Sequence, residues 1–206
     1  MKFLAVALAL LLSPVVPAAA HGRDLGREVL GRDDGWGAGT TGGARASAAD
    51  VSVVSNRAEL AAALVRRPGV PKIVYVRGRI EGNVDAANRP MSCSDFADPG
   101  YSLDAYLAQY DPATWGKQPV SGPLEEARAR SQRNQEAQVV LPVGSNTTVV
   151  GLGDNAILHG LTLRVQGSDN VILRNLRFED AHDCFPQWDP NDGAQGNWNS
   201  EYEMSS

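Results

Sequence analysis

The chain has 206 residues, of which 43% are apolar, and a formal net charge of −5. This is enough apolar content for one domain with a hydrophobic core. A net negative chain without a basic block is a poor partner for nucleic acid or an anionic membrane, so we expect neither. An acidic polymer would bind such a chain only through a local basic groove or through bridging cations.

Residues 1–20 have the pattern of a secretory signal peptide. A basic residue, Lys2, precedes an apolar run over 3–12, and small residues follow at Ala18-Ala19-Ala20. The apolar run is too short to span a bilayer, and no later run is long enough. We therefore expect cleavage after Ala20, a secreted, extracellular protein and a mature domain over 21–206; an uncleaved anchor is the alternative.

The first predicted elements are a strand, a helix and a second strand. The alternating run 51–54 predicts a strand, and 73–76 predicts another. Asn56 with Glu59 three residues later has capping-box spacing, so a helix is expected to start there and to end at 68–69, a Pro-Gly pair. A helix in this position would cap a stack of strands and shield its edge from pairing with other chains.

Residues 84–137 interrupt the strand pattern and predict an excursion with a short polar helix over 125–133. Four aromatic residues lie in the excursion, namely Tyr101, Tyr106, Tyr110 and Trp115. Aromatic residues among Asp, Pro and Gly can form platforms for sugar rings, but packing inside the protein is their commoner use. We expect packing.

Strand-like runs then recur at a fixed interval. The run 146–152 aligns with 170–176 at an offset of 170 − 146 = 24 residues, and a third run covers 156–165. Repeats of roughly 20–45 residues indicate a solenoid, and β-branched runs between Gly, Asp and Asn turns indicate a β-solenoid. The pattern reaches Ser206 after barely two coils, so we expect a solenoid truncated after its first coils.

The last run also predicts which side chains face the core. If the strand turns at Asn175, apolar side chains on both sides of the turn point inward, and the Asn amide hydrogen-bonds to backbone groups or to an Asn of a neighbouring coil. Arg174 and Arg177 would then face outward, and we expect them to be solvated. The inward-facing residues are Val171, Leu173, Leu176 and Phe178.

Two cysteines remain after export, Cys93 and Cys184. An even number in a secreted chain favours a disulfide between them, and two buried free thiols are the alternative. We expect no metal site from two cysteines, and no metal or base role for His182. The acidic residues Asp180, Asp183, Asp189 and Asp192 lack EF-hand spacing and are expected to stabilise local turns.

The C-terminal segment resembles a known family. The residues Asp183-Cys184-Phe185-Pro186-Gln187-Trp188-Asp189-Pro190, followed by Gly196-Asn197-Trp198-Asn199-Ser200-Glu201-Tyr202, are similar to the calcium-dependent bacterial pectate lyases of polysaccharide lyase family 1. The resemblance implies a right-handed, single-stranded parallel β-helix, all-β in class, with an N-terminal capping helix. It implies a secreted monomer that uses Ca²⁺ to cleave polygalacturonate, the backbone of pectin, by β-elimination.

The resemblance assigns few site residues. The family's catalytic arginine belongs to an Arg-x-Pro-x-x-Arg stretch that this sequence lacks, and Arg164, Arg174 and Arg177 do not match it. We therefore assign no catalytic residue and expect the 206-residue chain itself to be inactive. Glu203 occupies the position of one calcium ligand, where the family usually has Asp; a frayed terminal residue is the alternative.

Two other functions remain open. The first is a non-catalytic β-solenoid module that binds acidic polysaccharide through its aromatic loop. The second is a β-helix hydrolase of the same polymer, which would need a pair of carboxylic acids with a water between them. The sequence fixes no such pair.

Overall fold

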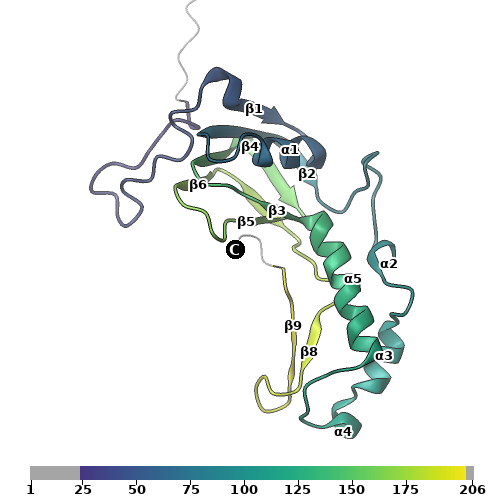
Figure 1. Cartoon of the computed structure of the whole chain (residues 1–206). Coiled ribbons are helices and arrows are strands. Elements are labelled where there is room, and N and C mark those ends of the chain that lie inside the picture. Colours follow the sequence, from purple (N-terminus) through teal and green to yellow (C-terminus); the bar gives the residue numbers. More distant parts are fainter. Residues whose placement is uncertain (1–23, 203–206) are drawn as a thin grey trace, which may run out of the picture.

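The computed structural model describes residues 24–202 (Figure 1). The predicted signal peptide and Glu203 lie outside the described residues. Among the described residues, no helix is both long and apolar enough to cross a bilayer. The helices are α1 (Arg57–Val65), α2 (Cys93–Phe96), α3 (Leu103–Gln109), α4 (Pro112–Trp115) and α5 (Pro123–Val139). The strands are β1 (Val51–Val54), β2 (Lys72–Glu81), β3 (Val140–Pro142), β4 (Thr147–His159), β5 (Thr162–Arg164), β6 (Val171–Arg174), β7 (Arg177–Glu179), β8 (Gln187–Asp189) and β9 (Asn197–Asn199).

Figure 1 shows two regions, a strand-rich stack and an arm. The stack contains α1 and β1–β7. The arm consists of α2–α5 and the hairpin β8–β9, and α5 runs from the stack along its length. Helix α5 packs against α2 and α3, and the hairpin joins them through an aromatic cluster.

All strand pairings in the stack are parallel. The large sheet has the order β1-β2-β4-β6, with β7 also paired to β4, and a small sheet joins β3 to β5. Thr147 pairs with Val171, an offset of 171 − 147 = 24 residues, which confirms the repeat predicted from the sequence. Parallel strands stacked at a fixed offset form a β-solenoid.

The third repeat run does not form a separate strand. Residues 156–159 instead continue β4, and the chain bends at Gly160, where φ is 60°, before β5 begins. The reason is the length of β2, a strand of ten residues that pairs with β4 on both sides of a bulge between Arg77 and Arg79. The backbone hydrogen bonds of β2 therefore hold the two halves of β4 in one strand.

Asn175 forms the predicted corner. It has a φ of 53°, and its Nδ2 donates hydrogen bonds to the carbonyl oxygens of Gly151 (2.9 Å) and Gly153 (2.6 Å). A pair of asparagines also links neighbouring coils, because Asn170 Nδ2 donates to Asn146 Oδ1 at 2.7 Å. The predicted inward orientation is confirmed, since all four of its apolar side chains pack against the main core: Val171, Leu173, Leu176 and Phe178.

The prediction that both arginines are solvated is wrong for Arg174. Its side chain is half-buried, and Nη1 donates to the Leu25 carbonyl (3.0 Å) and pairs with Glu28 Oε2 (3.3 Å). The cause is the N-terminal segment, which returns across the outer face of β6. Arg177, in contrast, has a side chain that is 64% exposed, and it pairs with Glu179 at 2.8 Å.

Helix α1 starts where the sequence predicts. Asn56 Oδ1 accepts a hydrogen bond from Glu59 N at 2.9 Å, and the side chains of Leu60 and Leu64 are buried in the core of the stack. At the other end, buried Lys72 donates from Nζ to the carbonyls of Leu64 and Arg66. The last carbonyls of α1 are thus satisfied by a side chain of β2.

The arm contains more helix than predicted. Helix α5 extends beyond 125–133 at both ends, and α2, α3 and α4 were not predicted. The buried face of α5 includes polar residues that pair with other segments, so no apolar repeat marks its full length. Two of the four excursion aromatics, Tyr106 and Tyr110, are buried against Trp188, with ring centroids of the tyrosines 4.6 Å apart. The expectation of packing is confirmed for these two.

Residues 24–46, here called the N-terminal strap, lie against the large sheet. Gly43 N donates to Thr148 Oγ1 at 2.9 Å, and Asn170 Oδ1 accepts from Thr41 N (2.7 Å) and Gly42 N (2.8 Å). A Cβ atom at Gly43 would lie 1.9 Å from the Lys72 carbonyl oxygen. Only glycine allows the strap to approach the backbone of β2 this closely.

We expect Gly43→Ala to lower the free energy of unfolding by about 1–3 kcal/mol, because the added methyl group must displace the strap or the backbone of β2. Gly144→Ala is the matched control, since nothing lies within 4 Å of its Cβ position. Urea denaturation followed by tryptophan fluorescence measures both. Equal stability of the two variants would show that the strap does not constrain the sheet.

Candidate functional site

Residues 180–202 connect the large sheet to the small one. The segment leaves β7 after Glu179, forms the hairpin of the arm and returns at Tyr202. Tyr202 packs on Val139 and Val140, and its hydroxyl donates to the Gln132 carbonyl at 2.8 Å. The chain therefore arrives beside the strands β3 and β5.

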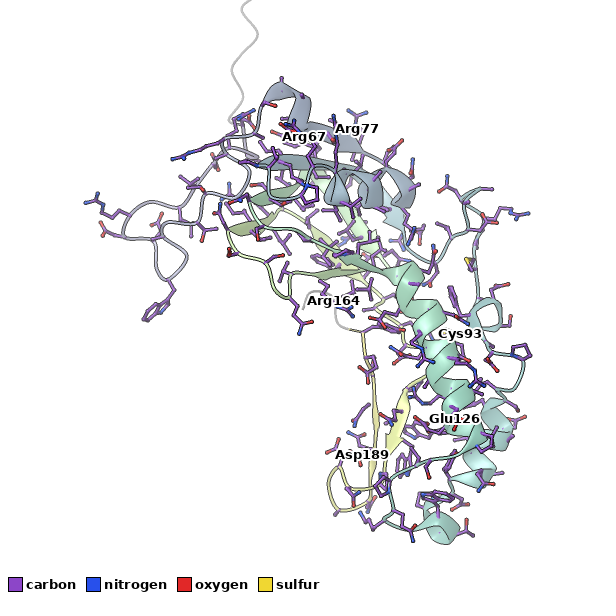
Figure 2. The ribbon with its side chains drawn as sticks, in the orientation of Figure 1. Arg67, Arg77, Cys93, Glu126, Arg164 and Asp189 are labelled. Atoms are coloured by element: carbon purple, nitrogen blue, oxygen red, sulfur yellow. A yellow bond between two sulfur atoms is a disulfide. The ribbon has the colours of Figure 1, made fainter. Side chains whose placement is uncertain are left out.

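We call this surface the site face: β3, β5, Tyr202 and the end of α5 next to them. Arg164 at the end of β5 is half-buried, and its Nη1 contacts Glu136 Oε1 of α5 at 2.7 Å. Figure 2 shows Arg164 among the strands, next to the end of α5 that meets the stack. The pKa of the Tyr202 phenol is raised, first by burial and then by the Asp183 and Glu136 carboxylates. The guanidinium of Arg164 and the carboxylate of Glu136 thus lie together on the site face.

The prediction that the acidic residues of the connecting segment stabilise local turns is confirmed for Asp183 and Asp189. Asp183 accepts from Phe185 N (2.8 Å) and Glu201 N (3.0 Å), and Asp189 accepts from Asn191 N (2.8 Å). Two others contact side chains. Asp192 accepts from Asn197 Nδ2 at 3.2 Å, and Asp180 lies 3.5 Å from His159 Nε2.

A buried ion pair fixes the connecting segment to α5. The side chains of Arg128 and Glu125 are 6% and 12% exposed, and both guanidinium contacts to the carboxylate are 2.9 Å. Arg128 Nη1 also donates to the Phe185 carbonyl at 2.7 Å. Burial alone would lower the pKa of Arg128, but the hydrogen bonds and charge of Glu125 outweigh it and raise the pKa. Tyr106 and Gln187 donate to the same carboxylate, which is therefore fully engaged.

A disulfide joins the arm to the same segment. The sulfur atoms of Cys93 and Cys184 are 2.03 Å apart, and their Cα atoms are 5.4 Å apart. His182 lies beside the disulfide, with a ring nitrogen within 4.8 Å of both sulfur atoms. In Figure 2, Cys93 lies beside α5, whereas Asp189 lies further along the arm.

Among residues 24–202, the group of Cys93, His182 and Cys184 is the only set of three or more potential metal ligands. Glu136 on the site face already pairs with Arg164, and the oxygens of nearby Asp183 already accept from two backbone N–H groups. Calcium takes about 6–8 oxygen ligands, so these carboxylates alone do not form a calcium site. The predicted ligand Glu203 follows Tyr202 directly in sequence and lies outside the described residues.

Sequence reasoning missed Arg128, Glu125, Glu136 and the position of His182. Glu125 and Arg128 are three residues apart, which is a helical ion-pair spacing, but that spacing predicts an exposed pair as readily as a buried one. The sequence alone shows of Arg164 only that it does not belong to an Arg-x-Pro-x-x-Arg stretch. The structure gives it a place on the site face.

We expect Arg128→Met to lower the free energy of unfolding by about 3–5 kcal/mol, because it leaves the Glu125 carboxylate buried without its counter-ion. Arg133→Met, at an exposed position of the same helix, should change stability by no more than about 0.5 kcal/mol. Adding Glu125→Gln to Arg128→Met should recover part of the loss, because no buried charge then remains unpaired. Chemical denaturation of the four proteins measures this; a loss no larger than that of Arg133→Met would contradict the buried-pair assignment.

Comparison with known proteins shows what this fold and segment are similar to. A sequence model of a family described as "Pectate lyase" matches residues 121–204. Pectate lyase of Bacillus subtilis (strain 168) is 52% identical over 98% of this chain, and pectate lyase D of Dickeya chrysanthemi is 32% identical over 83% of it. The chain spans 49% of the length of the first relative and 33% of the second.

Solved structures agree with the sequence relatives. A variant of Bacillus subtilis pectate lyase superposes with a TM-score of 0.85 at 52% identity, covering 89% of this chain and 47% of that one. A pectate lyase bound to a hexasaccharide superposes with a TM-score of 0.86 at 52% identity, with the same coverage of both chains. From its sequence and its fold alike, the chain belongs to the pectate lyase family.

Proposed function

We propose that the protein to which this chain belongs cleaves polygalacturonate by calcium-dependent β-elimination. The observation that carries the proposal is the 52% identity to a pectate lyase over 98% of this chain. The substrate class is supported by the structural neighbour with a bound hexasaccharide. The reaction breaks the bond between a uronate C4 and its glycosidic oxygen after the proton on C5 is removed, and it leaves an unsaturated sugar end.

The site face is our candidate for the part of this chain that meets the polysaccharide. Arg164 supplies a guanidinium, which suits a uronate carboxylate because the two groups match in charge and geometry. Glu136 positions Arg164 through their 2.7 Å contact. None of the described arginines belongs to an Arg-x-Pro-x-x-Arg stretch, so we assign the base of the reaction to none of them.

Ca²⁺ is the cofactor that fits the proposal, because a hard cation suits oxygen ligands and neutralises uronate carboxylates. When bound, it would polarise the carboxylate next to the reacting carbon and so ease proton removal. Glu203 is our proposed ligand from this chain. Glu203 follows Tyr202 directly in sequence, and Tyr202 is buried against Val139 and Val140 next to the site face.

The finer features of the fold are also proposals. The parallel pairing supports a single-stranded β-helix, which we take to be right-handed, as parallel crossovers almost always are. Helix α1 packs against β1, β2 and β3, in keeping with a cap on the first coil. We further propose that the protein is a secreted monomer, with the signal peptide over residues 1–20.

The test joins residues 21–206 to the part of the Bacillus subtilis pectate lyase that this chain does not match. We expect the chimera to release unsaturated product from polygalacturonate, measured by ultraviolet absorbance. Chelation of Ca²⁺ should lower the rate at least ~100-fold, because a metal of this kind contributes several kcal/mol. The 206-residue chain alone should release no such product, since the arginine stretch is absent from its sequence.

The unmodified Bacillus subtilis enzyme is the positive control, and a cooperative thermal melt shows that the chimera is folded. A folded chimera that yields no unsaturated product in Ca²⁺ would refute the lyase proposal. New reducing ends without ultraviolet absorbance would indicate a hydrolase. Retention on a polygalacturonate gel without turnover would favour the non-catalytic binding module.

A further inference from the structure

We propose that reduction of the Cys93–Cys184 disulfide converts this part of the arm into a zinc-binding site with His182 as the third ligand. The sulfur atoms and a ring nitrogen of His182 all lie within 4.8 Å of one another. Two thiolates and one imidazole are a common zinc donor set. The function proposed above uses none of these three residues.

Zinc binding requires the two sulfur atoms, which are 2.03 Å apart in the disulfide, to separate by about 1.7 Å. Zinc–sulfur bonds of about 2.3 Å and zinc–nitrogen bonds of about 2.0 Å at a tetrahedral angle place the ligand atoms roughly 3.5–3.8 Å apart. A ring nitrogen within 4.8 Å of both sulfurs therefore needs to approach by at most about 1.3 Å, and rotation of the side chains supplies both movements. His182 is exposed and both cysteines are half-buried, so an ion can reach the site.

Each half of the disulfide is also held by α5, independently of the sulfur–sulfur bond. On one side, fully buried Gln135 donates to the His182 carbonyl at 2.8 Å and accepts from Cys184 N at 3.0 Å. Phe185 is held next to it by Arg128. The segment that carries both His182 and Cys184 is thus fixed at three backbone atoms.

Cys93, the first residue of α2, is held near α5 by contacts of α2 and of the residues that follow it. Phe96 is buried, and its carbonyl accepts a hydrogen bond from Asn134 Nδ2 at 3.0 Å. Asp98, two residues further on, accepts from Arg130 Nε at 2.7 Å and donates its backbone N–H to Ser131 Oγ at 2.8 Å. When the disulfide opens, these contacts keep the cysteines close together.

The site has room for a fourth ligand. A cavity of about 430 Å³ adjoins the disulfide and is lined in part by Tyr101, Leu103 and Pro186. Asp183 also lines this cavity, but both of its oxygens accept backbone N–H groups. Water is therefore the expected fourth ligand, and three protein ligands with one exchangeable position form an open site.

Opening the disulfide requires a two-electron reductant. A dithiol transfers two electrons and two protons to the sulfur–sulfur bond and is itself oxidised to a disulfide, leaving two cysteine thiols. Binding of Zn²⁺ then displaces both thiol protons to the solvent. In an oxidising medium the disulfide persists and the ligands are unavailable, so zinc binding reports the redox state of the arm.

The experiment uses the whole chain, reduced with a phosphine that is then removed without air, and titrated with Co²⁺ as a coloured substitute for Zn²⁺. We expect one equivalent to produce the visible absorption bands of tetrahedral cobalt with thiolate ligands, and Zn²⁺ to abolish them. The oxidised chain should show no such bands. His182→Ala should weaken Zn²⁺ binding roughly 10- to 100-fold or more.

His159→Ala is the matched control, because His159 contacts Glu81 on the large sheet and lies outside the cluster. Its cobalt spectrum and zinc affinity should equal those of the unchanged chain. Circular dichroism of the reduced chain tests whether the arm keeps its structure. Three results would overturn the proposal: loss of the native spectrum on reduction, an unchanged Zn²⁺ affinity in His182→Ala, or the same affinity for the reduced chain in denaturant.

Discussion

The parallel register of β4 with β2, β6 and β7 is the constraint on which the rest of the molecule depends. Each coil must return to the same register, so every excursion must leave and re-enter the stack at fixed points. The first excursion ends where α5 runs directly into β3. The second leaves β7 at Glu179 and returns at Tyr202. Both excursions re-enter beside the small sheet, and their meeting there creates the site face.

The other segments of the arm are joined to α5 by polar side chains as well as by apolar packing. Arg128, Ser131 and Gln135 follow one another along the buried face of α5, and each one pairs with the backbone of another segment. A buried polar group is costly unless it is paired, so these residues tolerate only one position of the segments they bind. Apolar contacts alone would fix that position less strictly.

The stack was predictable from sequence because its signals are local and repeated. Runs of β-branched residues and the asparagines at 146, 170 and 175 determine strands and corners at a regular interval. The arm was not predictable in the same way. The contacts of Gln135 and Arg128 join residues far apart in sequence and follow no period, and Arg174 is half-buried only because the N-terminal strap returns across β6. On the site face, the sequence drew attention to Arg164, but no sequence pattern indicated that Glu136 is its partner.

Helix α5 contacts two separate parts of the molecule, the site face and the segment that carries the disulfide. Its end nearest the stack carries Glu136, which holds Arg164 on the site face. One residue earlier, Gln135 holds the backbone of His182 and Cys184 on the arm. Adjacent residues on a helix point in directions about 100° apart, so the two contacts lie on different sides of α5. A shift of α5 along its axis would therefore disturb both contacts together.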